Sequence, residues 1–226
     1  IVDDTDNFAI IGIQGPNAQR IVRDLIGQPI NMEMNGNVVP KDAGSIRMIS
    51  RRSYSGEDGF DVWVTPDRNR DVFQCLVEAG ALPAGEVTLD RLRIESGIPK
   101  YGTDIDDRVV PLEGGIRDTV DFAKGCFIGQ EVLGKMQNIG KPRRFLVGLF
   151  AERIVDPETE LVSDGKVVGL VKSGVESIAL ERVISLASVR RGFEETGTTI
   201  DVASGGQVEV TALPFVMGKS ITISDL

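Results

Sequence analysis

The residue types in this 226-residue chain restrict its chemistry, because it has two cysteines and no histidine. Histidine is the commonest general base in proteins, so a Ser-His-Asp triad within this sequence is excluded. One cysteine, Cys126, lies in the run KGCFIGQEV, next to glycine and near a lysine rather than among apolar residues. Such surroundings make Cys126 a candidate for a reactive thiol.

The environment predicted for Cys126 favours its thiolate form. The following residues, GQEVLGKM, predict the first turns of a helix, and the free N–H groups at a helix N-terminus attract an anion. Lys124 adds a positive charge nearby, so a catalytic pair of Cys126 and Lys124 is one hypothesis. The alternative is a tight turn in which Cys126 only packs. The spacing leaves both open.

A second candidate is Glu57 in the run YSGEDGF. A carboxylate on a glycine-supported turn can accept hydrogen bonds from an amino-pyrimidine edge. We expect Asp58 to be a solvated turn residue. The alternative for Glu57 is an ordinary acidic hairpin turn.

Charged residues also occur in the run LRIESG and in the loop after it. Arg91 and Glu95 have the i, i+4 spacing of an ion pair on an exposed helix face. Arg93 lacks such a partner and either points into a cleft, where it would suit a carboxylate, or lies on a solvated helix face. The acidic loop that follows does not have the spacing of an EF-hand calcium loop, so we do not assign it a metal; its residues are Asp104, Asp106 and Asp107.

These candidates need elements to position them, and the first part of the chain predicts strands and helices. We expect a strand over 8–13, then a helix that starts at Pro16, stops at Gly27 and buries one face; the face comprises Ala18, Ile21, Val22, Leu25 and Ile26. Two strands are expected around a turn at 54–59, with Asp61 and Trp63 alternating with apolar residues.

Two further helices are expected before a long loop. One covers 66–79, with Cys75 as a free core cysteine beside the apolar face formed by Val72, Phe73, Leu76 and Val77. The other covers 88–96, with Leu89 and Leu92 inward and a stop at Gly97. The stretch over 98–115 is dense in turn residues and is expected to be mostly loop.

Beyond the short basic joint GKPRR, every segment predicts a strand. Asp164-Gly165 between alternating apolar positions is a strong hairpin signal, and Gly205-Gly206 gives a second turn. The fold class is therefore α+β, ending in a small antiparallel barrel or sandwich. We place the two domains at 1–141 and 142–226.

Composition sets the remaining expectations. The net charge of −9 argues against general affinity for nucleic acid or anionic membranes. No apolar run approaches the roughly 18 residues of a membrane span. Two cysteines cannot form a disulfide framework, which favours a reducing compartment, the cytoplasm or an organellar matrix in a eukaryote. We expect a monomer.

Four motifs in order resemble the folate-binding family of the glycine-cleavage T-protein; they are IQGPNAQ, SRRSYSGEDGFDVWV, LDRLRIESGIPKYGTDID and KGCFIGQEV. The last resembles the K-G-C-x-x-G-Q-E motif of the YgfZ-like branch. The resemblance implies a T-protein-type folate-binding domain followed by a β-barrel. In the family, roughly the first third of the chain precedes IQGP, and we expect that part, with much of the folate site, to be missing here.

The resemblance implies site residues and a cofactor, tetrahydrofolate or a one-carbon derivative. Glu57 matches the glutamate that bonds the pterin, Arg93 matches an arginine at the folate site, and Tyr54 lies in the same turn as Glu57. The residues that match the YgfZ-like motif are Lys124, Gly125, Cys126, Gly129, Gln130 and Glu131. In that branch the lysine and the cysteine are regarded as functionally important, which implies a role for Lys124 and Cys126.

The function implied first is a tetrahydrofolate-binding YgfZ-like protein that supports iron–sulfur cluster assembly or repair, with iron–sulfur client proteins as partners. The alternative is a tetrahydrofolate-dependent aminomethyltransferase or methyltransferase of T-protein type, with a lipoyl carrier protein as partner. No acidic residue that would help to release the amine is evident in the sequence. A third reading is a scaffold with a vestigial folate site.

Overall fold

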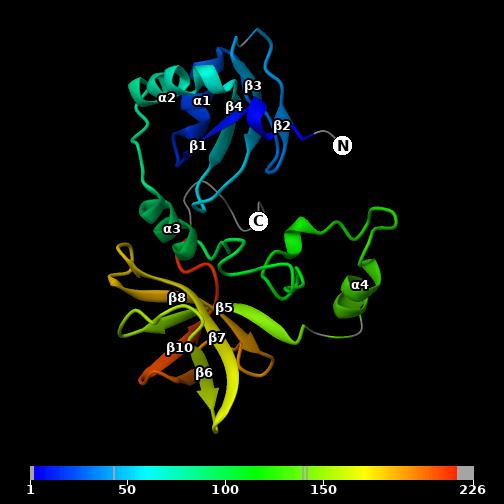
Figure 1. Ribbon diagram of the computed structural model, residues 1–226, viewed down its shortest axis with the longest axis vertical. Coiled ribbons are helices and arrows are strands. Elements are labelled where there is room, and N and C mark those ends of the chain that lie inside the picture. Colours follow the sequence, from blue (N-terminus) through cyan, green and yellow to red (C-terminus); the bar gives the residue numbers. More distant parts are fainter. Residues whose placement is uncertain (1–2, 43, 139, 141, 218–226) are drawn as a thin grey trace. The chain divides into compact units, whose positions relative to one another are not determined.

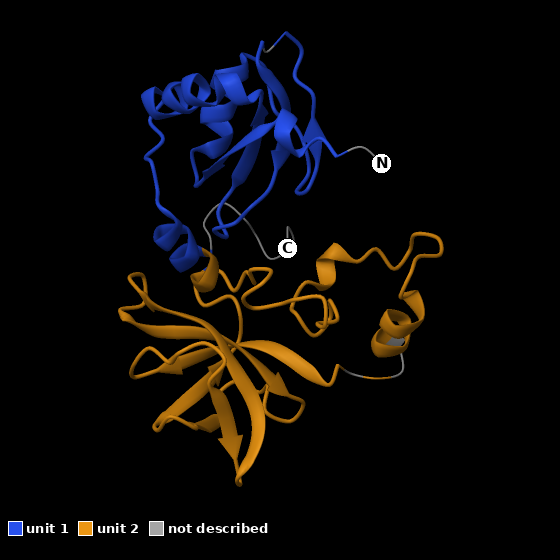
Figure 2. Cartoon of the chain, viewed as in Figure 1, with its two compact units in different colours: residues 1–92, 217–226 blue, residues 93–216 orange. Residues whose placement is uncertain are grey.

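The computed structural model describes residues 3–42, 44–138, 140 and 142–217 (Figure 1). The chain forms two compact units (Figure 2): unit 1 contains residues 1–92 and 217–226, and unit 2 contains residues 93–216. Within the described ranges, no helix is long and apolar enough to cross a membrane.

Unit 1 is built on a four-stranded antiparallel sheet in the order β1-β4-β3-β2; the strands are β1 (Ala9–Gln14), β2 (Asn37–Val38), β3 (Ile46–Arg51) and β4 (Gly59–Val64). Helices α1 (Ala18–Ile26) and α2 (Asn69–Glu78) lie together beside this sheet (Figure 1). Short 3₁₀ turns precede β1 at Thr5–Asn7 and α2 at Pro66–Arg68. The strands and helices predicted for this part of the chain are thus confirmed.

The core of unit 1 lies where the apolar residues of β1 and β4 meet the helices. Phe60, Val62 and Val64 alternate along β4 and are fully buried against Ile21 and Val22 of α1, among others. α1 ends as expected, because Gly27 adopts a positive φ of 67° and donates its N–H to the carbonyl of Arg23. The helix begins at Ala18 rather than at Pro16, which lies in the preceding turn.

Some side-chain placements predicted for unit 1 are wrong. Cys75 is exposed on α2 rather than buried in the core, and Phe73 is also exposed, because only Val72 and Leu76 of this helix reach the core. The predicted inward positions of Leu89 and Leu92 are likewise wrong, since both side chains are exposed. A free cysteine on an exposed helix face has no packing role.

Helix α3 (Glu86–Glu95) contains the division between the units, and its last residues, Arg93, Ile94 and Glu95, are buried in unit 2. The loop predicted over 98–115 is confirmed, with one isolated bridge between Tyr101 and Ile105. A 3₁₀ turn at Arg117–Thr119 and α4 (Gln130–Asn138) follow.

The rest of unit 2 is a closed antiparallel barrel in the order β10-β5-β8-β7-β6-β9. Its strands are β5 (Arg144–Ala151), β6 (Glu160–Ser163), β7 (Lys166–Ser177), β8 (Arg182–Arg190), β9 (Thr199–Val202) and β10 (Gln207–Thr211). The barrel confirms the fold class. The domain boundary expected near residue 142 stays a prediction, because the barrel begins at residue 144 whereas unit 2 begins at residue 93.

The hairpin signals in the barrel have a clear backbone basis. Asp164 and Gly165 join β6 to β7 with positive φ angles of 49° and 70°, as the two central residues of a type I′ turn require. Gly205 and Gly206, at φ angles of 97° and 88°, lie between β9 and β10. These turns therefore fix which strands pair.

Candidate functional site

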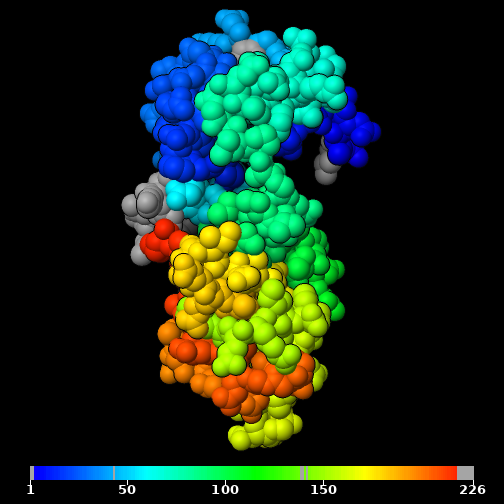
Figure 3. Space-filling model, turned by 90° about the vertical axis from the view of Figure 1, so that its left-hand side faces the viewer, coloured from blue at the N-terminus to red at the C-terminus, as the bar shows by residue number. Residues whose placement is uncertain are grey.

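Unit 1 contains a cavity of about 570 Å³, which we call the β1 cavity because β1 and its continuation line one side of it. Figure 3 views unit 1 from the side where α2 and the segment after it lie beside β1 and α1. Most of the lining is apolar; it includes Ile11, Ile13, Ile21, Phe73, Leu76, Leu82, Leu89 and Leu92. This explains why Leu89 and Leu92 are exposed, since they face the cavity rather than a packed core.

Asp61 and Tyr54 are the two titratable residues among the cavity-lining side chains. Asp61 lies on β4 opposite Gly12 of β1, and only 5% of the residue is exposed. Its Oδ2 accepts a hydrogen bond of 2.8 Å from the Tyr54 hydroxyl. Its Oδ1 has no hydrogen-bond partner in the part of the chain that the structure describes. Oδ1 is not, however, among the fully buried side-chain atoms that lack a partner.

The surroundings of Asp61 shift its titration. Burial raises the pKa of Asp61, whereas the Tyr54 hydrogen bond and the positive charge of Arg52 lower it. Burial also raises the pKa of Tyr54, and its hydrogen bond to Asp61 raises it further. The hydroxyl therefore remains a donor to the carboxylate at neutral pH.

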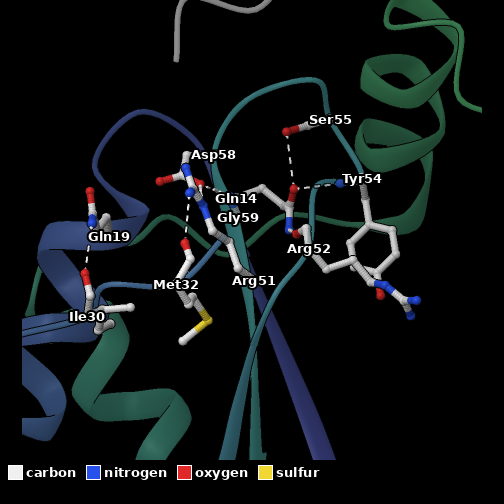
Figure 4. A network of polar contacts seen from close by, with 10 residues as sticks. All are labelled: Gln14, Gln19, Ile30, Met32, Arg51, Arg52, Tyr54, Ser55, Asp58 and Gly59. Atoms are coloured by element: carbon white, nitrogen blue, oxygen red, sulfur yellow. Dashed lines mark hydrogen bonds and ion pairs between the residues drawn. The ribbon is translucent and has the colours of Figure 1, made fainter. Parts of the chain in front are cut away.

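Gln14 holds the 52–58 loop, which carries Tyr54, in place (Figure 4). Its amide group donates to the carbonyl of Arg52 at 3.0 Å and accepts from the Tyr54 backbone N–H at 2.8 Å and from the Ser55 hydroxyl at 3.3 Å. This close approach requires glycine at position 59, where a Cβ atom would lie 2.3 Å from Gln14 Nε2 and 2.5 Å from the Arg52 carbonyl.

Asp58 holds the other end of the loop, so its prediction as a solvated turn residue is wrong. It is buried, and its Oδ1 accepts from Arg51 Nε at 2.9 Å and from the Gly59 N–H at 3.1 Å. Arg51 also donates to the carbonyl of Met32 at 3.0 Å, as Figure 4 shows. A buried carboxylate is retained here because an arginine and a backbone N–H satisfy it.

The structure brings together only some of the predicted site residues. Tyr54 lines the β1 cavity. Glu57 is half-buried in the same loop, where its N–H lies 3.3 Å from the Ser55 hydroxyl, but it is not among the cavity-lining residues. Arg93 belongs to unit 2. The folate contacts expected of Glu57 and Arg93 therefore stay predictions.

Arg93 lies in a buried polar network, so the solvated helix face that was one alternative is wrong. Its guanidinium donates to Asp104 Oδ2 at 2.7 Å, to the Ser173 hydroxyl at 2.8 Å and to the carbonyl of Ile98 at 3.2 Å. Asp104 also accepts from the backbone N–H groups of Lys100 and Ser173 at 2.8 and 3.0 Å. This network fastens the end of α3 and the loop after it to β7.

The exposed position predicted for Glu95 is also wrong. Glu95 is buried, and its Oε1 accepts from the Ser177 hydroxyl at 2.6 Å. The i, i+4 spacing of Arg91 and Glu95 predicted an exposed pair, but the end of α3 packs against the barrel rather than facing water.

Cys126 and Lys124 lie in an exposed loop before α4 in unit 2. The Lys124 ammonium lies 5.0 Å from the centre of the Phe127 ring, and the Gln130 side chain accepts from the Phe127 N–H at 3.1 Å. The helix predicted after Cys126 is confirmed as α4. The thiol is exposed, which does not fit the alternative in which Cys126 packs in a tight turn, and its role as a reactive thiol stays a prediction.

Reasoning from the sequence missed Asp61 as a site residue. Its signal was a carboxylate between Phe60 and Val62, which the alternation placed on the other face of the strand from these apolar residues without saying whether that face is covered. Both faces of β4 are covered, so this carboxylate is buried. Among the residues that the structure describes, no group of three His, Cys, Asp or Glu side chains could hold a metal ion.

Both parts of the chain match models of known protein families. Residues 1–124 match the model described as "GCVT N-terminal domain", and residues 144–216 match the "Glycine cleavage T-protein C-terminal barrel domain". The second match begins where β5 begins.

Individual relatives agree with these models. An aminomethyltransferase of Streptomyces avermitilis is 35% identical over 227 residues, covering 94% of this chain and 61% of the relative. One of Halothermothrix orenii is 33% identical over 226 residues, covering 96% of this chain and 63% of the relative. The chain thus spans less than two thirds of the length of these relatives.

A solved structure shares the fold. The crystal structure of glycine cleavage system aminomethyltransferase T from Bartonella henselae aligns with a TM-score of 0.81 at 24% identity, covering 95% of this chain and 61% of that chain. With the two family models, this architecture of a GCVT-type domain and a six-stranded barrel shows that the chain belongs to the glycine-cleavage T-protein family.

Proposed function

We propose that this chain supplies the folate-binding surface of a tetrahydrofolate-dependent aminomethyltransferase or methyltransferase. The observation that carries the proposal is Asp61: a carboxylate that is 5% exposed, lines an apolar cavity and keeps one oxygen free of protein hydrogen bonds within the described ranges. A ligand that filled the cavity without donating to Oδ1 would leave a buried acceptor without a partner, which is costly, so a ligand donor is the natural partner for Oδ1. The aminomethyltransferase names of the relatives support the reaction class.

The chemistry of a reduced pterin fits this cavity. Its pyrimidine ring is flat and largely apolar on its faces, and one edge of that ring carries an amino group and a ring N–H. The apolar lining suits the faces, while Asp61 accepts from the edge and Tyr54 holds the carboxylate in place. In this proposal Asp61 takes the role of pterin acceptor that the family resemblance implied for Glu57, and Glu57 is a contact at the loop edge.

The proposed reaction transfers one carbon. In the aminomethyl case the carbon of an aminomethylated lipoyl carrier becomes the methylene bridge between two folate nitrogens. The sulfur leaves as a thiol and the amine as ammonia. The residues of this chain bind and orient the folate. Its partner is a lipoyl carrier protein, and the proposed compartment is the cytoplasm or an organellar matrix.

The test uses the full-length gene product with calorimetry on 5-formyl-tetrahydrofolate and an assay of methylene-tetrahydrofolate formation from an aminomethylated lipoyl carrier. Saturable binding with turnover supports the proposal. Binding that survives Asp61→Asn unchanged would remove Asp61 from the site, and absence of binding would refute the folate function.

A second candidate rests on the KGCFIGQE motif and its exposed cysteine. In this reading the protein binds folate without turnover and supports iron–sulfur cluster assembly or repair, with Cys126 and Lys124 as the active pair. Cys126→Ala should then abolish complementation of an iron–sulfur enzyme defect while folate affinity stays unchanged. Turnover in the lipoyl assay, or full complementation by Cys126→Ala, would reject it.

A further inference from the structure

Two adjacent arginines at the end of β3 have different surroundings. Arg51 has a structural role, because its guanidinium donates hydrogen bonds to Asp58 and to the carbonyl of Met32. Arg52 is exposed and forms no ion pair within 4.0 Å of a carboxylate in the described part of the chain. Its side chain runs beside Tyr54 (Figure 4), and its charge acts on both Tyr54 and Asp61.

The backbone of Arg52 is fixed on both sides, which distinguishes it from an arginine on a loose surface loop. Its N–H donates to the carbonyl of Gly59 at 2.9 Å, and its own carbonyl accepts from Gln14 Nε2 at 3.0 Å. The side chain therefore leaves the sheet at a defined point next to Tyr54. An exposed arginine loses side-chain conformational entropy when it holds one position. Because the backbone of Arg52 is already fixed, only its side chain has to be ordered.

We propose that Arg52 is a positioning residue for the β1 cavity: with Tyr54 it keeps Asp61 a charged acceptor, so that Oδ1 is presented to the ligand as a carboxylate oxygen. The inference rests on the folate function proposed above and deepens it. Tyr54 bonds Oδ2 directly, whereas Arg52 acts through its field and through the Tyr54 hydroxyl.

Few other charges face Asp61. The lining contributed by β1, α1, α2 and residues 80–92 carries no titratable side chain, and Gly12 lies opposite Asp61 in the sheet. Tyr54 and Arg52 are thus the groups that set its ionisation against the effect of burial. Removal of the Arg52 charge should raise the pKa of Asp61 further. As the pH is lowered, the ligand-binding carboxylate should then become protonated at a higher pH than in wild type.

The experiment compares Arg52→Gln with Arg47→Gln in the full-length gene product. Arg47 is an exposed arginine on β3, so its replacement removes the same charge from the same unit. Calorimetry with 5-formyl-tetrahydrofolate between pH 5 and 8 measures how the affinity falls as the pH is lowered. This fall is expected to begin at a higher pH for Arg52→Gln than for wild type. At the acid end of this range its affinity should be about two- to threefold below that of wild type. Arg52→Lys should restore most of the profile, and Arg47→Gln should match wild type.

A second readout separates this inference from the folate proposal. The ¹³C resonance of the Asp61 carboxyl, titrated without ligand, should show its midpoint displaced upward in Arg52→Gln and unchanged in Arg47→Gln. If the wild type binds no folate but this displacement is found, the folate function fails and the role of Arg52 stands. An unchanged Asp61 titration in folded Arg52→Gln would overturn the inference, whatever the folate result.

Discussion

Asp61 in unit 1 and Asp104 in unit 2 are both buried carboxylates, but their hydrogen-bond partners differ. Asp104 receives an arginine, a serine hydroxyl and two backbone N–H groups, so all its acceptor capacity is used inside the fold. Asp61 receives one tyrosine hydroxyl and leaves Oδ1 without a donor in the described part of the chain. The difference separates a carboxylate that holds structure from one that we propose binds a ligand.

The surroundings of Asp104 and Asp61 differ in the same way as their hydrogen-bond partners. Asp104 lies where the end of α3 meets the barrel and has no exposed side-chain surface. Asp61 lines a cavity whose lining is mostly apolar, where one charged acceptor provides directional recognition. Each of the following variants tests one side of this comparison.

The largest effect is expected for Asp104→Ala in unit 2. This change removes the carboxylate partner of the buried Arg93 guanidinium, and breaking a buried ion pair on one side typically costs about 3–5 kcal/mol. Chemical denaturation should show that loss in the free energy of unfolding of the barrel-containing unit. Asp107→Ala, on an exposed residue of the same loop, should stay within about 0.5 kcal/mol of wild type. Equal effects of the two variants would contradict the assigned network.

Asp61→Asn should have a smaller effect, and on binding rather than folding. The amide keeps the size of the side chain but removes the charged acceptor, which should weaken folate binding by about 1–3 kcal/mol. Calorimetry measures the affinity, and circular dichroism checks that the fold is retained. An Asp61→Asn protein that binds folate like wild type but unfolds easily would assign Asp61 to structure instead.

The smallest expected effect is on the pH dependence of stability. Because burial raises the pKa of Asp61, the folded state holds its proton more tightly than the unfolded chain. The contribution of Asp61 is therefore fully present below the unfolded pKa of about 3.9 and is lost as pH rises through the higher folded value. Thermal unfolding between pH 4 and 7 should show this loss in wild type and not in Asp61→Asn. An identical slope in both proteins would mean that Asp61 does not titrate differently on folding.

The elements themselves were largely predictable from the sequence. Period-two strands in the barrel, the Asp164-Gly165 turn and the Gly27 helix stop are local signals, and each has a direct backbone cause. The β1–α1 segment was also predicted, because its apolar periodicity and glycine positions agree.

Side-chain environments were less predictable, because they depend on contacts between distant segments. Asp58 and Glu95 looked solvated by local rules, yet their partners come from Arg51 on β3 and Ser177 on β7. Leu89 and Leu92 looked like core residues and instead line a cavity. Asp61 was missed for the same reason: alternation says which residues share a face of a strand, but not whether that face is covered.

A structure of the full-length gene product bound to 5-formyl-tetrahydrofolate tests the central claim most directly. The account predicts a ligand N–H within hydrogen-bond distance of Asp61 Oδ1, with the Tyr54 hydroxyl still on Oδ2 and the partners of Asp104 unchanged. A ligand bound elsewhere, with Asp61 Oδ1 bonded only to water or protein, would contradict it.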